Sequence, residues 1–351
     1  MFIIFIRVVT RIFRGFRHTG QSRDIYIFGR ITLYDKTVTM EYRYIFGPVP
    51  SRRLGISLGI DLIPPKTCSY NCIYCESGKT TNLTVERKEY VPLDDVIAEL
   101  DAVLRTHPKL DFVTYAGSGE PTLHSGISEV TRFVKENYPE YKTALLTNGS
   151  LFYDENVRRD CLDIDVVIPS LDCAGETAFK KVDRPHRSLS VATVNDGIAK
   201  FASEYAGQLW LEIFVVPGIN DTDEEIARIN TEIAKIRPDK IQLNTLDRPG
   251  VVDWIRPADD RAMQAFADKL CHDNIEIAGK PASRSSNKAY SGDTSEVILR
   301  TVRRRPCTLD DIVKITGLHS NEVNKYLSVL VAEGKITEAR GERGVFYRSA
   351  E

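Results

Sequence analysis

Residues 55–80, GISLGIDLIPPKTCSYNCIYCESGKT, join an apolar β-rich run to a loop that contains three cysteines. The apolar run predicts a strand, and the two prolines after it predict the end of that strand. Cys68, Cys72 and Cys75 follow with the spacing C-x3-C-x2-C. Because one loop directly after a strand carries all three thiols, we expect them to converge at the end of a sheet.

Three cysteine thiolates can hold a cuboidal 4Fe-4S cluster and leave one iron without a protein ligand, open to a substrate or cofactor. A structural zinc ion is one alternative, but a closed site needs a fourth Cys or His. The neighbouring residue is Glu76, and the nearest histidine is His107. Coincidental buried cysteines are a second alternative, which the glycines and prolines around the motif argue against. The spacing therefore favours Cys68, Cys72 and Cys75 as metal ligands of an iron-sulfur cluster.

Beyond this loop, β-rich runs alternate with amphipathic helical stretches. Strands are predicted at residues 55–63, 111–117, 142–148, 165–172, 209–218 and 239–247. Helices are predicted between them at residues 93–107, 127–138, 190–205 and 222–236. This alternation is typical of an α/β fold with a parallel sheet. Six units suit a partial (β/α)6 barrel, whose active site belongs at the carboxyl ends of the strands.

Composition divides the chain into four segments. Residues 1–39 combine a short apolar run with regularly spaced arginines and predict a poorly ordered extension, with a membrane-surface helix as the alternative. Residues 40–275 form the predicted barrel, and residues 276–293 read as a polar linker. Residues 294–351 predict three helices and a two-strand wing, which is the pattern of a winged helix-turn-helix domain.

The bulk composition limits the classes of protein. A formal net charge of -2 at pH 7 excludes the global basic field of a dedicated nucleic-acid binder. No run is long and apolar enough to predict a membrane span. Three of the seven cysteines fall within eight residues, and the other four are scattered. This usage favours a cytoplasmic metal-binding protein over a disulfide-linked one.

The motif CSYNCIYC, with an aromatic residue before its last cysteine, resembles that of the radical S-adenosylmethionine (SAM) superfamily. The resemblance covers about residues 46–249, and residues 44–80 look like the branch that includes the tRNA wyosine-base synthases. It implies that the three cysteines ligate a 4Fe-4S cluster, that SAM chelates the fourth iron, and that Tyr74 lies near the adenine. It also implies reductive cleavage of SAM to a 5'-deoxyadenosyl radical, with an external one-electron reductant of the ferredoxin or flavodoxin type.

The end of the second predicted barrel strand carries Gly117, Ser118, Gly119 and Glu120. This segment is similar to the Gly-Gly-Glu segment of the superfamily, whose backbone holds the methionine end of SAM. Ser118 stands where the family has its first glycine. Glycines allow the backbone to approach a ligand closely. An ordinary strand-to-helix turn is the alternative.

The next strand ends carry Thr147 and Asn148, then Ser170 and Asp172. The resemblance implies that such short polar side chains bind the ribose hydroxyls and the carboxylate of SAM, whereas helix N-capping is the alternative. Glu212 lies in an otherwise apolar strand and needs a partner if it is buried. We therefore expect Glu212 to face a ligand and to belong to the cofactor-binding set.

Several further residues are candidates for the substrate pocket. Gln242 and Asn244 alternate with apolar residues, so their amides share one face, which we expect to be the barrel interior. If that face is the exterior, both amides are only solvated. Four arginines in proline-rich loops are candidate ligands for an anionic substrate, with surface solvation as the alternative: Arg52, Arg53, Arg184 and Arg248.

The motifs do not identify the substrate, which is a peptide, an RNA or a small molecule. A wyosine-type tRNA-modifying enzyme is one alternative, but those relatives carry a second cluster on cysteines ahead of the triplet, and no cysteine precedes Cys68 here. A redox-sensing DNA-binding regulator is another. The polar strand ends argue against it, because a sensor needs no SAM pocket.

The predicted winged domain has few of the residues that DNA recognition requires. Its third helix, residues 318–330, supplies Asn321, Asn324 and Lys325 but also Glu322. A helix that reads the major groove needs polar and basic residues on its outward face and basic residues beside it. The positive charge lies elsewhere, at Arg303, Arg304, Arg305, Arg340 and Arg343. We expect this domain to recognise the substrate of the enzyme, with a packing module that closes the open side of the barrel as the alternative.

Overall fold

The computed structural model describes residues 43–51, 53–278, 294–318 and 320–350. The predicted N-terminal extension, Arg52 and most of the predicted linker lie outside these residues. The main body is an eight-stranded sheet with the order β1-β2-β5-β6-β7-β8-β9-β10. Its strands are β1 (Ile45–Ser51), β2 (Gly55–Ile60), β5 (Phe112–Tyr115), β6 (Lys142–Thr147), β7 (Val166–Pro169), β8 (Gln208–Phe214), β9 (Lys240–Asn244) and β10 (Ile275–Ile277).

All neighbouring strands from β2 to β10 are parallel, and only β1 runs antiparallel, against β2. The predicted α/β fold with a parallel sheet is thus confirmed. The sheet is an open series of strands rather than a closed barrel, because no pairing joins β1 to β10 among the described residues. A separate two-stranded ladder joins β3 (Thr67–Cys68) to β4 (Asn82–Leu83).

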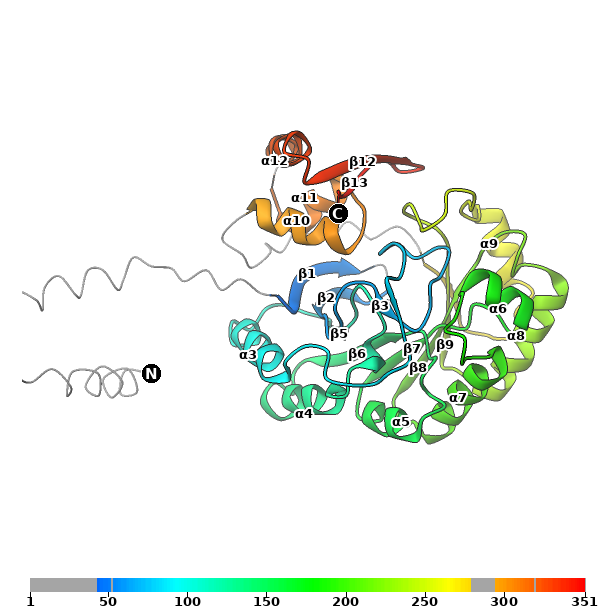
Figure 1. Ribbon diagram of the computed structural model, residues 1–351. Coiled ribbons are helices and arrows are strands. Elements are labelled where there is room, and N and C mark those ends of the chain that lie inside the picture. The colour runs from blue at the N-terminus through cyan, green and yellow to red at the C-terminus, as the bar shows by residue number, and fades with distance from the viewer. Residues whose placement is uncertain (1–42, 52, 279–293, 319, 351) are drawn as a thin grey trace, which may run out of the picture. The chain divides into compact units, whose positions relative to one another are not determined.

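Helices cover the outer face of the sheet (Figure 1). They are α3 (Leu93–Leu104), the 3-10 turn η1 (Pro121–Leu123), α4 (Ile127–Asn137), α5 (Glu155–Cys161), α6 (Glu176–Val182), α7 (Val191–Glu204), α8 (Asp223–Ile236) and α9 (Asp260–Ala267). Short polar residues begin several of them: the side chains of Asp154, Ser190 and Thr222 each accept a backbone N–H of the first turn. The apolar faces of these helices pack on the sheet and bury one large core.

The inner face of the sheet has its own small core. Leu54, in the turn between β1 and β2, packs against inward residues of the central strands, including Leu146, Ile168 and Trp210. Leu54 keeps only 3% of its surface exposed. The turn thereby closes the bottom of the inner face with apolar side chains, while the carboxyl ends of the strands carry polar ones.

Residues 294–350 fold into three helices and a small sheet. Their elements are α10 (Thr294–Arg304), β11 (Cys307–Thr308), α11 (Leu309–Thr316), α12 (Ser320–Ala332), β12 (Ile336–Gly341) and β13 (Gly344–Ser349). The strands pair antiparallel in the order β11-β13-β12. A separate apolar core centred on Ile298, Val323 and Leu327 holds this C-terminal region together. Helix α11 also packs against β1.

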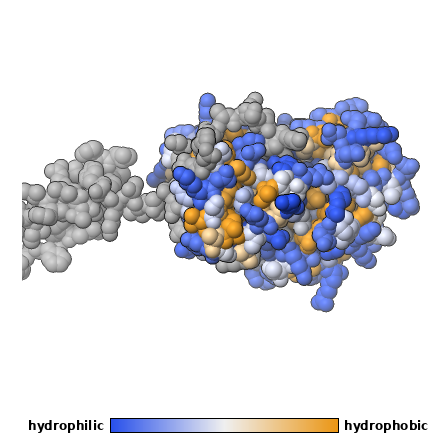
Figure 2. All heavy atoms as spheres, turned by 90° about the horizontal axis from the view of Figure 1, so that it is seen from above, coloured by the Kyte–Doolittle hydropathy of each residue, from blue (hydrophilic) through white to orange (hydrophobic). Residues whose placement is uncertain are grey.

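The described surface carries mostly polar side chains. On the face drawn in Figure 2, hydrophilic residues predominate and hydrophobic residues lie in small groups between them. None of the described helices combines the length and hydropathy needed to cross a membrane.

Candidate active site

The three cysteines lie in the loop that leaves β3. Each is partly buried, and none is in a disulfide. Cys68 Sγ accepts hydrogen bonds from Tyr70 N at 3.5 Å and from Asn148 Nδ2 at 3.6 Å. Cys72 Sγ donates to Asp183 Oδ1 at 3.7 Å. The loop is therefore held by the tops of other strands and not only by its own turns.

The electrostatics of this loop favour neutral thiols unless a metal binds. Burial raises the pKa of Cys68 to about 12, and the Glu120 carboxylate adds to the effect. Burial also raises the pKa of Cys72, with Asp183 as the next cause, and the pKa of Cys75. A coordinated cysteine is a thiolate, so metal binding at this loop releases protons.

The donor set fits an iron-sulfur cluster. Three soft thiol donors come from one short segment, and three irons of a cuboidal cluster would each take one of these cysteines. Among the residues that the structure describes, no group of three or more His, Cys, Asp or Glu side chains is arranged to hold a single metal ion.

Tyr74 lies between the cysteines and the end of β8. Its ring stacks on Phe214 with centroids 3.8 Å apart and planes 10° apart. Its hydroxyl donates to Asp172 Oδ2, and Asp172 Oδ1 accepts from Phe214 N at 2.7 Å. Burial raises the pKa of Asp172 and, together with the Asp172 charge, that of Asp183. Two neighbouring buried carboxyls thus lie directly below the cysteine loop.

Glu120 joins the tops of two strands. Its Oε1 accepts from Thr122 N at 3.0 Å and from Thr147 Oγ1 at 2.6 Å, and its Oε2 accepts from Asn148 N at 2.8 Å. Gly119 beside it has no room for a side chain, because a Cβ there would lie 2.0 Å from the Thr67 carbonyl oxygen. The predicted site segments after β5 and β6 are therefore locked to each other and to the cysteine loop.

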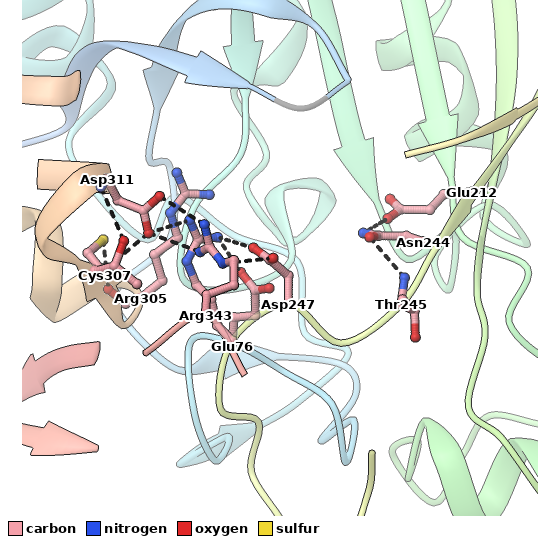
Figure 3. A network of polar contacts seen from close by, with 11 residues as sticks. Glu76, Glu212, Asn244, Thr245, Asp247, Arg305, Cys307, Asp311 and Arg343 are labelled. Carbon is pink, nitrogen blue, oxygen red and sulfur yellow. Dashed lines mark hydrogen bonds and ion pairs between the residues drawn. The ribbon is translucent and has the colours of Figure 1, made fainter. Parts of the chain in front are cut away.

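A second polar group lies on the inner face of the sheet. Ser170 forms an isolated bridge with Glu212, which places the end of β7 beside β8. Glu212 Oε2 pairs with Arg53. Glu212 Oε1 accepts from Asn244 Nδ2 at 3.0 Å (Figure 3). The sequence predicted that Glu212 needs a partner, and Arg53 supplies it. This partner could not be read from the sequence, because it lies 159 residues away.

Part of this set borders one cavity of about 390 Å³. Its lining does not include Cys68, Cys72, Glu120, Thr147, Asn148 or Asp172. Its lining includes Tyr74, Cys75, Gly117 and Ser170, and its apolar floor includes Leu54. The C-terminal region contributes several further lining residues: Val297, Arg300, Thr301, Arg304, Arg305, Asp311, Lys314 and Ile315. The volume is within the range of small-molecule sites.

A buried ion-pair network joins the cysteine loop to the C-terminal region (Figure 3). Arg248 donates to Glu76 Oε2 at 3.1 Å and to Asp311 Oδ2 at 3.2 Å. Arg343, from the turn between β12 and β13, donates to both Asp311 oxygens and pairs with Asp247 at 2.9 Å. Burial alone would raise the pKa of Asp311, but the Arg248 charge and the Arg343 hydrogen bond hold it below its usual range.

The structure brings together most of the residues singled out in the sequence. Thr147, Asn148, Ser170 and Asp172 are not the N-caps of the following helices, since Asp154 and Gly175 occupy those positions. Glu120 does cap η1 through Thr122 N, so the ordinary turn alternative holds for part of its role.

Other candidates differ from expectation. Gln242 is buried but donates to Glu276, and it is not among the residues lining the cavity, whereas Asn244 is. Arg343 and Arg304, two of the arginines that the sequence places away from the third helix, pair with Asp311 and with Asp61. Isolated sequence windows could not show this, because each pair joins segments far apart in the chain.

Two features of the site had no signal in the sequence. Asp183 lies in a loop after α6 and reaches Cys72. Arg304 stacks over Phe46 with its guanidinium 4.3 Å from the ring centroid and pairs with Asp61 at 3.5 Å. Only the tertiary contacts reveal these residues as neighbours of the cavity.

The fold and the cysteine loop define a radical SAM domain, since the model of the Radical SAM superfamily matches residues 62–229. A radical SAM methyltransferase from Sphaerobacter thermophilus has the same fold, with a TM-score of 0.52 at 15% identity over 63% of this chain and 65% of that one. A UPF0026 protein of Methanocaldococcus jannaschii is 31% identical over 86% of this chain and 94% of its own length. The chain belongs to the UPF0026 family of radical SAM proteins.

A longer relative is a Brachyspira hyodysenteriae protein named GTPase Obg, which is 36% identical over 85% of this chain. This chain spans only 44% of the length of that relative. Members of the radical SAM superfamily use a 4Fe-4S cluster and SAM, and these are the cofactors of this chain.

Proposed function

We propose that this chain is a radical SAM enzyme that cleaves SAM reductively and begins radical chemistry on a substrate held in the cavity. The observation that carries this proposal is that Cys75 and Tyr74 of the cysteine loop line one cavity together with Gly117, Ser170 and Glu212 from three strand ends. When bound, the cluster supplies the electron that cleaves SAM, after reduction by an external ferredoxin or flavodoxin. Cys68, Cys72 and Cys75 are the proposed ligands of that cluster.

The remaining site residues would position SAM. The segment from Gly117 to Glu120 offers a backbone without side-chain obstruction at Gly119, and Glu120 fixes it to Thr147 and Asn148. The backbone N–H and C=O groups of residues 117–120 therefore lie near the cysteine loop. This position suits the binding of the methionine end of SAM. Ser170 and Glu212 lie on the inner face, where short polar groups suit the ribose.

Tyr74 and Asp172 form the wall on the adenine side in this proposal. One face of the Tyr74 ring lies flat against Phe214, which fixes the orientation of the ring. Asp172 fixes the Tyr74 hydroxyl and the backbone at the end of β8 at the same time. Both therefore act by orientation, and the apolar floor formed by Leu54 excludes water below the cavity.

The C-terminal region, which we assign as a winged helix-turn-helix domain, completes the substrate pocket. It supplies lining residues from α10 and α11. Its arginines Arg304 and Arg343 are used in contacts with the main body, which leaves less positive charge for a duplex. These contacts support substrate recognition at the cavity and, at the same time, a packing role.

Anaerobic reconstitution with iron and sulfide tests the proposal. The loaded protein, reduced with dithionite in the presence of SAM, should form 5'-deoxyadenosine and methionine, measured by liquid chromatography and mass spectrometry. A protein without reductant is the matched control and should form neither. A fully loaded cluster that produces no 5'-deoxyadenosine under reduction contradicts the enzyme assignment.

A further inference from the structure

The side chains that line the cavity carry more positive than negative charge. Six cationic side chains line it, against three carboxylates. The cations are Arg53, Arg248, Arg300, Arg304, Arg305 and Lys314, and the carboxylates are Glu76, Glu212 and Asp311. A cavity with low-dielectric walls and an excess of one sign raises the local concentration of ligands of the opposite sign.

The three carboxylates are already engaged by two of these arginines. Glu212 pairs with Arg53, while Glu76 and Asp311 both pair with Arg248. Arg304 has its partner, Asp61, outside the cavity lining. None of these three carboxylates forms an ion pair with Arg305 or Lys314.

Arg305 and Lys314 are the clearest part of this excess. Both are half-buried and line the cavity, one at the end of α10 and the other within α11. Neither has an ion-pair partner among residues 43–51, 53–278, 294–318 and 320–350.

One buried donor adds to these cations. Arg248 Nε has almost no solvent contact and no hydrogen-bond partner in the described part of the chain, and Arg248 lines the cavity. Arg304 Nε is buried as well, but it faces Asp61 at 3.5 Å. Burial lowers the pKa of Arg304, the Asp61 charge raises it, and the nearby Arg300 charge lowers it.

We propose that the C-terminal side of the cavity binds the anionic group, a carboxylate or a phosphate, of a small-molecule substrate, with Arg305 and Lys314 as its principal ligands. This inference rests on the proposed function and names the substrate class for that site. A cavity of about 390 Å³ that also borders the cysteine loop suits a small molecule. Guanidinium groups bind both anions through paired N–H donors, and an ammonium group adds a point charge.

This division gives two parts of the cavity wall separate tasks. The wall at Cys75 and Tyr74 belongs to the cofactors, and the wall at Arg305 and Lys314 anchors the substrate by its charge. A substrate fixed at its anionic end presents its other end toward the cofactors. The anchoring residues come from the C-terminal region, which explains how that region can determine specificity without contacting nucleic acid.

Isothermal titration calorimetry on the cluster-loaded full chain with SAM present tests the anchor. The probes are inorganic pyrophosphate and succinate, titrated separately at constant ionic strength, so that the phosphate and carboxylate sources are distinguished. We expect saturable binding of at least one probe, and about a tenfold or greater loss of affinity in the double variant Arg305→Ala, Lys314→Ala. Glycerol, a neutral probe, should not bind.

The matched control is Arg303→Ala, which removes an exposed arginine of the same helix that is not among the residues lining the cavity. It should keep the affinity of the parent. Iron content and the circular dichroism spectrum establish that each variant is folded and loaded. If the double alanine variant does not load, the pair Arg305→Gln, Lys314→Gln replaces it, because glutamine keeps most of the side-chain volume.

Three results would overturn the anchor: no saturable binding of either anion, unchanged affinity in the double variant, or an equal loss in Arg303→Ala. The last result would mean that the affinity reflects general positive charge. Calorimetry does not depend on SAM cleavage. A protein that binds the anion but forms no 5'-deoxyadenosine contradicts the proposed function alone, and the reverse result contradicts the anchor alone.

Discussion

The cysteine end of the main body and the C-terminal region use buried charge in opposite ways. Glu120 is buried among neutral donors of adjacent strand ends, from Thr122, Thr147 and Asn148. Asp311 is buried against two full charges, and one of them, Arg248, belongs to the main body. The first arrangement shapes a binding surface within one sheet. The second joins two hydrophobic cores that would otherwise meet over few contacts.

This difference predicts different consequences of mutation. A carboxylate held by neutral donors can be exchanged at moderate cost, whereas a buried ion pair that loses one member leaves an uncompensated charge. Substitutions at the cysteine end should therefore affect cofactors first. Substitutions in the ion-pair network should affect the folding free energy first and chemistry second.

The largest expected effect is at the cysteine loop. Cys72→Ala should abolish cluster binding and SAM cleavage, because two thiolates cannot hold the cluster in place. Iron content and the visible absorbance of the reconstituted protein measure the loss. Cys271→Ala, at an exposed cysteine outside the site, is the control and should load normally. A Cys72→Ala protein that retains its cluster would show that the ligands are different residues.

The next effect is expected at Arg248. Arg248→Ala leaves Glu76 and Asp311 without this partner and should lower the free energy of unfolding by about 3 to 5 kcal/mol. Urea unfolding followed by circular dichroism measures it. Lys269→Ala removes a partner from the exposed Asp223 and should leave the unfolding midpoint unchanged. If the two variants are equally stable, Arg248 does not hold the C-terminal region to the main body.

The buried carboxyl group of Asp61 should make the stability of the folded protein depend on pH. Burial raises its pKa to about 6, against the opposing effect of Arg304. Between about pH 4 and pH 6 the folded protein therefore holds a proton that the unfolded chain has lost, so stability from this group falls as pH rises through that window. Relative to Asp61→Asn, the parent should lose up to about 3 kcal/mol between pH 4 and pH 7.

Unfolding free energies of both proteins at several pH values measure this effect. Only their difference is compared, because other carboxyl groups titrate in both proteins. A difference that stays constant from pH 4 to pH 7 would contradict the raised pKa.

The smallest effect separates two roles of Asp311. Thr308 and Asp311 form a capping box at the start of α11, and Asp311 also accepts from Arg248 and Arg343. Thr308→Ala removes one cap hydrogen bond and should cost about 1 kcal/mol while the ion pairs remain. Thermal unfolding measures it. A loss as large as that of Arg248→Ala would mean that the cap, and not the ion pairs, holds the C-terminal region.

The sequence predicted the six central strands because each is an apolar run with clear ends. It did not predict β1, since Pro48 and Pro50 argue against a strand. The prolines are tolerated because β1 is an edge strand and runs antiparallel to β2. The strand β10 has only three residues and leaves too little pattern to be seen.

The candidate site divides in the same way. The cysteines and the strand-end residues Glu120, Thr147 and Ser170 could be read locally, because each follows a predicted strand directly. The partners of Glu212 and Asp311 could not, because Arg53 and Arg248 lie 159 and 63 residues away from them. Charge alone is a weak signal when its partner depends on the tertiary fold.

The turn that places Leu54 on the inner face affects how substrate enters the cavity and how product leaves it. Leu54 lines the cavity and packs on apolar side chains of the central strands, which cover that side of it. We therefore expect substrate and product to share an entrance away from Leu54. Exchange through a shared entrance is sequential: one molecule leaves before the next arrives, and a slowly departing product delays every turnover.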